Sequence, residues 1–137
     1  MRGGHVHNTV LMAPLITACR ELGIAHHIEA PARLREGAGS IDLLIEGERE
    51  FGSIAIEAEC SGHRVGKDIC KALAVNATDL WIVVPTGQVR RAIDGALGRA
   101  QGRPGQLIVS VLTLRQAQQR LRVYFPLISA SKEQGKE

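Results

Sequence analysis

The fold is decided by residues 40–60, which read SIDLLIEGEREFGSIAIEAEC. Two runs of the kind typical of strands, Ser40–Glu46 and Phe51–Cys60, are separated by a few polar residues that include Gly47. A linker this short favours a hairpin. We therefore expect the two strands to pair antiparallel.

Three acidic residues interrupt these apolar strands. A period of two puts Glu57 and Glu59 on one face of the second strand and Ile56 on the other. Neighbouring positions on one face lie about 6 to 7 Å apart, so Glu57 and Glu59 can reach one ion. Asp42 lies in the apolar partner strand, where a carboxylate is costly unless it is paired or bound to a metal. We expect Asp42, Glu57 and Glu59 to converge as a metal-binding cluster, and the alternative is an amphipathic hairpin whose acids face water.

The sequence on either side of the hairpin predicts alternating helices and strands in a single α/β domain over residues 1–129, with a disordered tail over 130–137. The Gly66–Ala77 helix is expected to carry Ile69, Leu73 and Ala77 on its apolar face and Lys67 and Lys71 on another. The remaining predicted elements are a helix from Asn8 to Gly23, a strand Ile24–Ala30, a polar loop Pro31–Gly39, a buried central strand Leu80–Val84, a helix Val89–Ala100, a strand Leu107–Leu112 and a helix capped by Thr113 that runs to Leu121.

Composition narrows the class of protein. With 137 residues and 45% hydrophobic content the chain can bury one core, and 3% aromatic content argues against stacking on unpaired bases. The 3 cysteines show no CxxC spacing, which argues against a disulfide framework and a structural zinc site. The sequence has neither a stretch of about 18 apolar residues nor the apolar core of a signal peptide. We therefore expect a cytoplasmic protein that does not enter a membrane.

Charge is distributed unevenly along the chain, whose net charge is +3. Acidic residues outnumber basic ones before Cys60, and arginines dominate beyond Thr86. These arginines suit either a surface that faces phosphates or a plainly solvated one. They are Arg90, Arg91, Arg99, Arg103, Arg115, Arg120 and Arg122.

The hairpin and its acids resemble those of the PD-(D/E)xK, or restriction-endonuclease-like, nuclease superfamily. The core of that superfamily runs helix, three strands, helix, strand. The resemblance spans about Asn8 to Pro85, with Asp42 at the motif aspartate and Glu57 at the second acid. Glu59 stands where the family usually has lysine, although some restriction endonucleases carry glutamate there.

This resemblance implies a restriction-endonuclease-like αβββαβ core with a mixed central sheet, extended by a C-terminal helix and strand. It implies that Asp42 and Glu57 hold Mg²⁺ (or Mn²⁺), with Glu59 as a further ligand or the general base, and that the substrate is DNA. Lys67 or Lys71 could supply the missing lysine from the next helix. Glu21 on the first helix could add a carboxylate, as in some relatives. The family is compatible with a homodimer and with a domain of a larger protein.

Two other functions stay open. A noncatalytic descendant of the same fold could bind DNA or another protein, because lysine is missing at position 59. An unrelated α/β ligand-binding domain would have outward, well-separated carboxylates and a pocket elsewhere.

Overall fold

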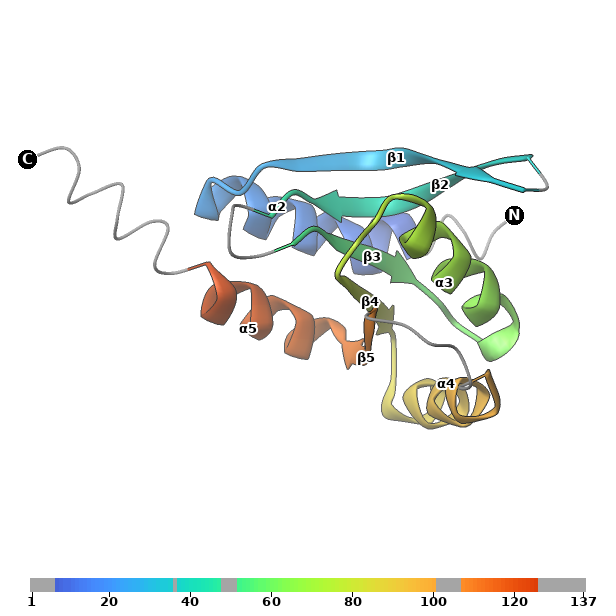
Figure 1. Ribbon diagram of the computed structural model, residues 1–137. Coiled ribbons are helices and arrows are strands. Elements are labelled where there is room, and N and C mark those ends of the chain that lie inside the picture. The colour runs from blue at the N-terminus through green and yellow to red at the C-terminus, as the bar shows by residue number, and fades with distance from the viewer. Residues whose placement is uncertain (1–6, 36, 48–51, 101–106, 126–137) are drawn as a thin grey trace, which may run out of the picture.

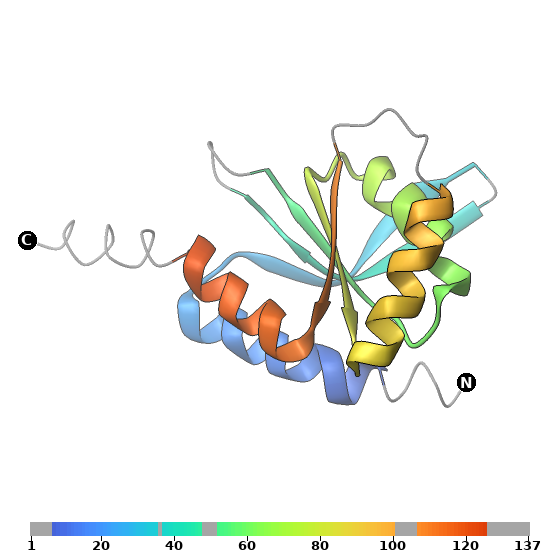
Figure 2. The ribbon, with the colours of Figure 1, turned by 90° about the horizontal axis from the view of Figure 1, so that it is seen from below.

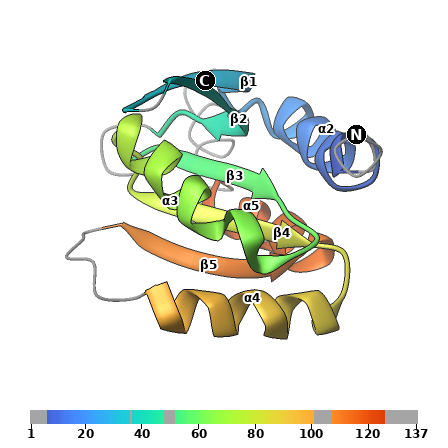
Figure 3. The same cartoon turned by 90° about the vertical axis from the view of Figure 1, so that its right-hand side faces the viewer.

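A mixed β-sheet is the frame of the molecule. The computed structural model describes residues 7–35, 37–47, 52–100 and 107–125, so the predicted tail over 130–137 lies outside the described residues. Within them, five strands form one sheet in the order β1-β2-β3-β4-β5 (Figure 3). β1, β2 and β3 pair antiparallel, and β3, β4 and β5 pair parallel. The strands are β1 (His26–Leu34), β2 (Gly37–Ile45), β3 (Ile54–Ala58), β4 (Asp79–Val84) and β5 (Ile108–Thr113).

Helices cover both faces of this sheet, which confirms the predicted α/β class. α2 and α5 lie side by side on one face, and α3 and α4 lie on the other (Figure 1, Figure 2). In the part of the chain described, none of the helices has the length and apolar character needed to cross a membrane. The helical elements are a π-helical turn η1 (His7–Met12), α2 (Ala13–Leu22), a 3₁₀ turn η2 (Gly62–Arg64), α3 (Val65–Ala74), α4 (Gly87–Ala100) and α5 (Leu114–Tyr124).

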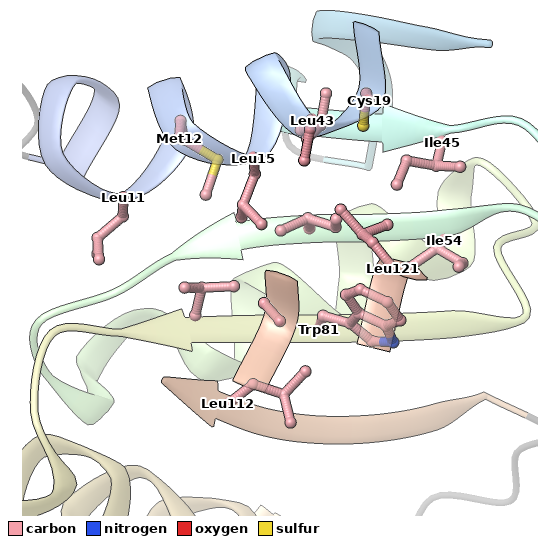
Figure 4. Close-up of a cluster of buried hydrophobic side chains, with 14 of the residues drawn as sticks. Leu11, Met12, Leu15, Cys19, Leu43, Ile45, Ile54, Trp81, Leu112 and Leu121 are labelled. Carbon is pink, nitrogen blue, oxygen red and sulfur yellow. The ribbon is translucent and has the colours of Figure 1, made fainter. Parts of the chain in front are cut away.

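Two apolar layers hold the helices on the sheet. Alternation along β4 places Trp81 and Val83 in the layer beneath α2 and α5, and Leu80, Ile82 and Val84 in the layer beneath α3 and α4. Figure 4 shows the first layer, in which Trp81 lies among side chains from α2, β2, β3 and α5. All five of these β4 residues are buried, which confirms the predicted central strand.

Local signals set several helix ends as predicted. Gly23 ends α2 in the left-handed region at φ 68°, and Pro14 lies in the first turn of that helix. Thr113 Oγ1 accepts a hydrogen bond from the Gln116 amide, and the Gln116 side chain accepts one from the Thr113 amide. This reciprocal pair is a capping box, and it fixes the start of α5.

The predicted polar loop Pro31–Gly39 is wrong, because the structure has a long hairpin there. β1 continues to Leu34, and β2 begins at Gly37, whose φ of 139° favours glycine. Pro31 is compatible with a strand because β1 is an edge strand, where a missing N–H need not break a ladder. Ala30 and Ala32 are buried, and the residues next to them are exposed. This strand-like alternation is hard to recognise in the sequence because the buried residues are small and turn-forming residues surround them.

Strand β2 is irregular at Asp42. Leu43 belongs to the layer beneath α2, but Ile41, two residues earlier, belongs to the layer beneath α3. Regular alternation would keep both residues on one face. The pairing of β1 with β2 skips Glu29, which lies opposite Asp42 and has a φ of 50°, rare for a residue other than glycine. The side chains of β2 therefore switch from one face of the sheet to the other at Asp42, the first of the predicted acids.

Candidate functional site

Asp42 and Glu57 lie opposite each other where the pairing of β2 with β3 ends. The last paired residues are Leu43 and Ile56. Beyond them the Asp42 backbone N–H donates to Glu57 Oε1 at 2.9 Å, and the Ala58 N–H donates to Asp42 Oδ2 at 2.9 Å. Each carboxylate thus takes the place that a backbone carbonyl would have in a regular ladder. These two bonds fix both carboxyl groups at one point of the sheet.

Lys71 reaches this point from helix α3. Its Nζ donates to Glu57 Oε2 at 2.9 Å, and Lys71 and Glu57 are only 6% and 2% exposed. The lysine stem passes Gly39 of β2, where an added Cβ would lie 3.5 Å from Lys71 Cε. Of the two lysines that the sequence offered, Lys71 lies beside the acids, whereas Lys67 is exposed on the same helix.

Two more carboxyl groups complete the cluster. Glu59 follows β3 directly, donates its backbone N–H to the Val83 carbonyl at 3.0 Å and is 5% exposed. Asp68 on α3 is 1% exposed, and its Oδ1 lies 4.0 Å from Lys71 Nζ. The carboxyl groups of Glu59 and Glu57 are close enough to Asp68 to affect its charge. We define Asp42, Glu57, Glu59, Asp68 and Lys71 as the acid cluster.

Burial and mutual repulsion set the protonation of these acids. Burial, together with smaller contributions from the neighbouring Glu59 and Glu57 carboxyl groups, raises the pKa of the Asp68 carboxyl to about 11. Burial also raises the pKa of Glu57, with a smaller contribution from the charge on Asp42, whereas hydrogen bonds from the Asp42 amide and Lys71 oppose the rise. Four carboxyl groups face one ammonium group, so the acid cluster favours additional positive charge, either protons or a cation.

The buried face of α3 carries two charged residues, so the predicted apolar face is only partly right. We expect Ile69, Leu73 and Ala77 to point inward from the sequence; Ile69 packs against the core and Ala77 is buried just beyond the end of the helix, but Leu73 is 45% exposed. The predicted cationic face is divided as well, since Lys71 points inward and Lys67 outward. Hydrophobic periodicity missed this orientation because bonds to acids of the hairpin offset the cost of burying charge. The buried residues of α3 are Val65, Asp68, Lys71 and Ala72.

The donors of the acid cluster fit the Mg²⁺ that the family resemblance implies. Carboxylate oxygens are the ligands that Mg²⁺ prefers, and the cluster has an excess of acid. Both Asp68 oxygens are buried and accept no hydrogen bond from a described donor. In the described ranges, however, no three histidine, cysteine, aspartate or glutamate side chains are arranged to hold a metal ion. The donor chemistry therefore fits a divalent cation, although these side chains form no ready-made cage.

Comparison with protein-family models, with curated proteins and with solved structures gave no match to this chain. The family resemblance therefore depends on the hairpin motif and on the arrangement of the acid cluster.

A basic groove lies on the other side of α3. Its volume is about 790 Å³, and we call it the α3 groove, lined by Arg33, Leu34 and Arg35 near the tip of the first hairpin and by Lys67, Cys70 and Leu73 of α3. Of the described residues that line it, three are cations and none is acidic. An added Cβ at Gly39 would lie 3.3 Å from Leu34 and 3.5 Å from the Lys71 stem. The groove therefore adjoins the path by which Lys71 reaches the acids.

The arginines beyond Thr86 do not form one surface. Arg90 and Arg91 belong to α4, on the α3 side of the sheet, whereas Arg115 and Arg122 belong to α5, on the α2 side. Arg120 has a structural role: its Nη1 donates to Ser110 Oγ at 2.8 Å, and its guanidinium carbon lies 5.6 Å from the centre of the Trp81 ring. The side chains of Arg99 and Arg103 lie outside the described residues. The predicted arginine flank is therefore divided between two faces.

Glu21, His26 and His27 lie outside the acid cluster. Glu21 is exposed on α2, which covers the opposite face of the sheet, so the extra carboxylate comes from α3 instead of the first helix. His26 and His27 bond to the Ile24 carbonyl and to Glu46, in keeping with a structural role. The interpretation that the hairpin acids face water is wrong for Glu57 and Glu59, which are buried.

Proposed function

We propose that the chain is a metal-dependent nuclease domain of the restriction-endonuclease-like kind that hydrolyses phosphodiester bonds in DNA. The observation that carries this proposal is the 2.9 Å contact of Lys71 Nζ with Glu57 Oε2, beside Asp42. An acid from β2, an acid from β3 and a lysine thus meet, although Glu59 occupies the usual place of the lysine. The observed element order α2, β1, β2, β3, α3, β4 supports the same assignment.

Each residue of the acid cluster has a role in this proposal. Asp42, Glu57 and Glu59 would hold Mg²⁺, which when bound supplies charge that polarises the phosphate and lowers the pKa of a water ligand. The hydrogen bonds between the hairpin strands keep Asp42 and Glu57 in place without a metal. Lys71 places an ammonium group where negative charge grows on the phosphate during attack by water. Glu59 is a further ligand or the general base.

Cleavage assays with Mg²⁺ or Mn²⁺ on single-stranded, duplex and branched DNA test the proposal. Asp42→Asn keeps an oxygen for the Ala58 amide but removes the charge, so we expect cleavage to fall by at least about 10²-fold. Glu46→Gln is the matched control, because Glu46 is an exposed acid that directly follows the last residue of β2. The catalytic proposal fails if the native chain cleaves none of these DNA forms with either metal.

The α3 groove supplies a path for the DNA backbone toward the acid cluster. Arg33, Arg35 and Lys67 can neutralise phosphates, and such contacts make binding dependent on salt. We expect the double change Arg33→Ala and Lys67→Ala to weaken binding about equally for unrelated sequences. The slope of log affinity against log salt should fall by about 1 for each cation removed.

Fluorescence anisotropy in EDTA measures this binding without cleavage. Arg122→Ala is the control, because Arg122 is an exposed cation on α5, across the sheet from the groove. Equal losses from Arg122→Ala and from a groove variant would show that the groove is not the path of the DNA.

A noncatalytic module is the second candidate, and two observations favour it. Both Glu57 oxygens already accept hydrogen bonds, from the Asp42 amide and from Lys71, and the described acids form no ready-made cage. Titration with Mn²⁺ separates the candidates, because a module need not bind the ion at Asp42 and Glu57. DNA binding that depends on salt, without cleavage, would favour the module.

A further inference from the structure

Asp68 is a buried carboxylate that has no hydrogen-bond donor among the described residues. It is 1% exposed, and neither Oδ1 nor Oδ2 accepts a hydrogen bond there. Lys71 Nζ is 4.0 Å from Oδ1, too far for a hydrogen bond, and it donates to Glu57 at 2.9 Å instead. Buried polar groups normally have partners, so this side chain requires an explanation.

The chemical groups around Asp68 indicate what kind of partner it needs. The groups near it are the carboxyl groups of Glu59 and Glu57, which are acceptors when ionised. Acceptors that face one another are stabilised only when something positive lies between them. Lys71 is the one cation of the acid cluster, and it is already paired with Glu57. The side chain of Asp68 is therefore directed into a group of acids that has less positive charge than it needs.

We propose that Asp68 is a ligand of the divalent cation bound by the acid cluster, an inference that rests on the proposed function. Helix α3 then contributes two residues to the site, with Lys71 bonded to Glu57 and Asp68 beside Glu59. In this arrangement the cation joins the hairpin to α3, and it supplies the partner that Asp68 lacks among the described residues. The main alternative is a structural pair of carboxyl groups in which Asp68 and Glu59 share a proton.

Mn²⁺ titration by calorimetry, on the full chain at neutral pH, tests the inference. Asp68→Asn has nearly the same shape but carries no charge, so we expect Mn²⁺ affinity to fall about 10- to 100-fold. Asp68→Glu, which keeps a carboxylate, should lose less affinity. Asp94→Asn is the matched control, because Asp94 is exposed on α4, and its affinity should equal that of the native chain.

Thermal unfolding in EDTA provides a readout independent of the ion. Asp68→Asn should unfold at the same temperature as the native chain or a higher one, because it removes a buried carboxyl group that has no hydrogen-bond donor among the described residues. Added Mn²⁺ should raise the unfolding temperature of the native chain much more than that of Asp68→Asn. A lower unfolding temperature for Asp68→Asn in EDTA would overturn the inference, because it would show that the protein itself supplies a partner for Asp68.

Failure of this inference can be told apart from failure of the proposed function. If the native chain binds Mn²⁺, Asp42→Asn abolishes binding and Asp68→Asn leaves it unchanged, Asp68 is no ligand and the proposed nuclease site stands. If the native chain binds no Mn²⁺, both proposals are wrong.

Discussion

Lys71→Met should lower DNA cleavage about 10²- to 10³-fold at saturating Mg²⁺, the loss expected when one charge-stabilising donor is removed. Lys71 is the one cation of the acid cluster, and its ammonium group is 2.9 Å from Glu57. Methionine keeps the unbranched apolar stem but loses the charge. Single-turnover kinetics measures the chemical step apart from product release.

Lys67→Met is the matched control for this prediction, since it removes a lysine from the exposed side of the same helix. It should weaken DNA binding through the α3 groove and leave the chemical step unchanged. Equal effects of the two changes on the chemical step would contradict the assignment of Lys71.

A rescue experiment separates a chemical role of Lys71 from a merely structural one. Position 59 is where the resembled family usually has its lysine, and Glu59 is buried next to the other acids. Adding Glu59→Lys to Lys71→Met should raise cleavage well above that of Lys71→Met alone, because an ammonium group returns to the acid cluster. A folded double variant that is no more active than Lys71→Met would show that the position of Lys71 matters for another reason.

The hairpin acids could be predicted from sequence because strand geometry is local. A period of two is enough to place Glu57 opposite the apolar side of β3, and a short linker is enough to pair β2 with β3. The irregularity at Asp42 could not be predicted in this way. It depends on Glu29 in a third strand and on hydrogen bonds between residues 15 or 16 positions apart.

The contribution of α3 was only partly predictable. Lys71 was a candidate, but apolar periodicity wrongly placed Leu73 on the buried face, and Asp68 was missed. The spacing of Val65, Asp68 and Ala72, three and four residues apart, was the available signal, since these positions share one face. To use this signal, one would have to predict that an aspartate is buried. That prediction is reasonable only once the acids of the hairpin are known to lie beside α3.

The largest effect on stability is expected from breaking the Lys71–Glu57 ion pair. Both side chains are buried, and removing one partner of a buried pair leaves an uncompensated charge, at a cost of about 3 to 5 kcal/mol. We expect Lys71→Met to lose about this much free energy of unfolding, measured with urea in EDTA so that no metal contributes. Glu57→Gln alone should be destabilising for the same reason, because Lys71 then lacks its partner.

The double variant Lys71→Met with Glu57→Gln tests whether the fold needs the ion pair for its stability. Glutamine still offers Oε1 to the Asp42 amide, and neither new side chain is charged, so stability should return to within about 1 kcal/mol of the native value or exceed it. Such a result would mean that the chain retains the pair for chemistry, since the fold does not need it. Losses that simply add would instead show that each residue stabilises the fold through other contacts.

The loss of stability in Lys71→Met should depend on pH, and the raised pKa of Glu57 sets the direction of that dependence. Burial already raises the pKa of Glu57, and loss of the lysine removes a group that opposes the rise. Folded Lys71→Met therefore retains a proton on Glu57 that the unfolded chain releases above about pH 4.3. A group whose pKa is raised by folding stabilises the fold at low pH and loses that contribution as pH rises. The deficit of Lys71→Met relative to the native chain should therefore be larger at pH 8 than at pH 5, and a deficit that shrinks with rising pH would contradict a buried, paired Glu57.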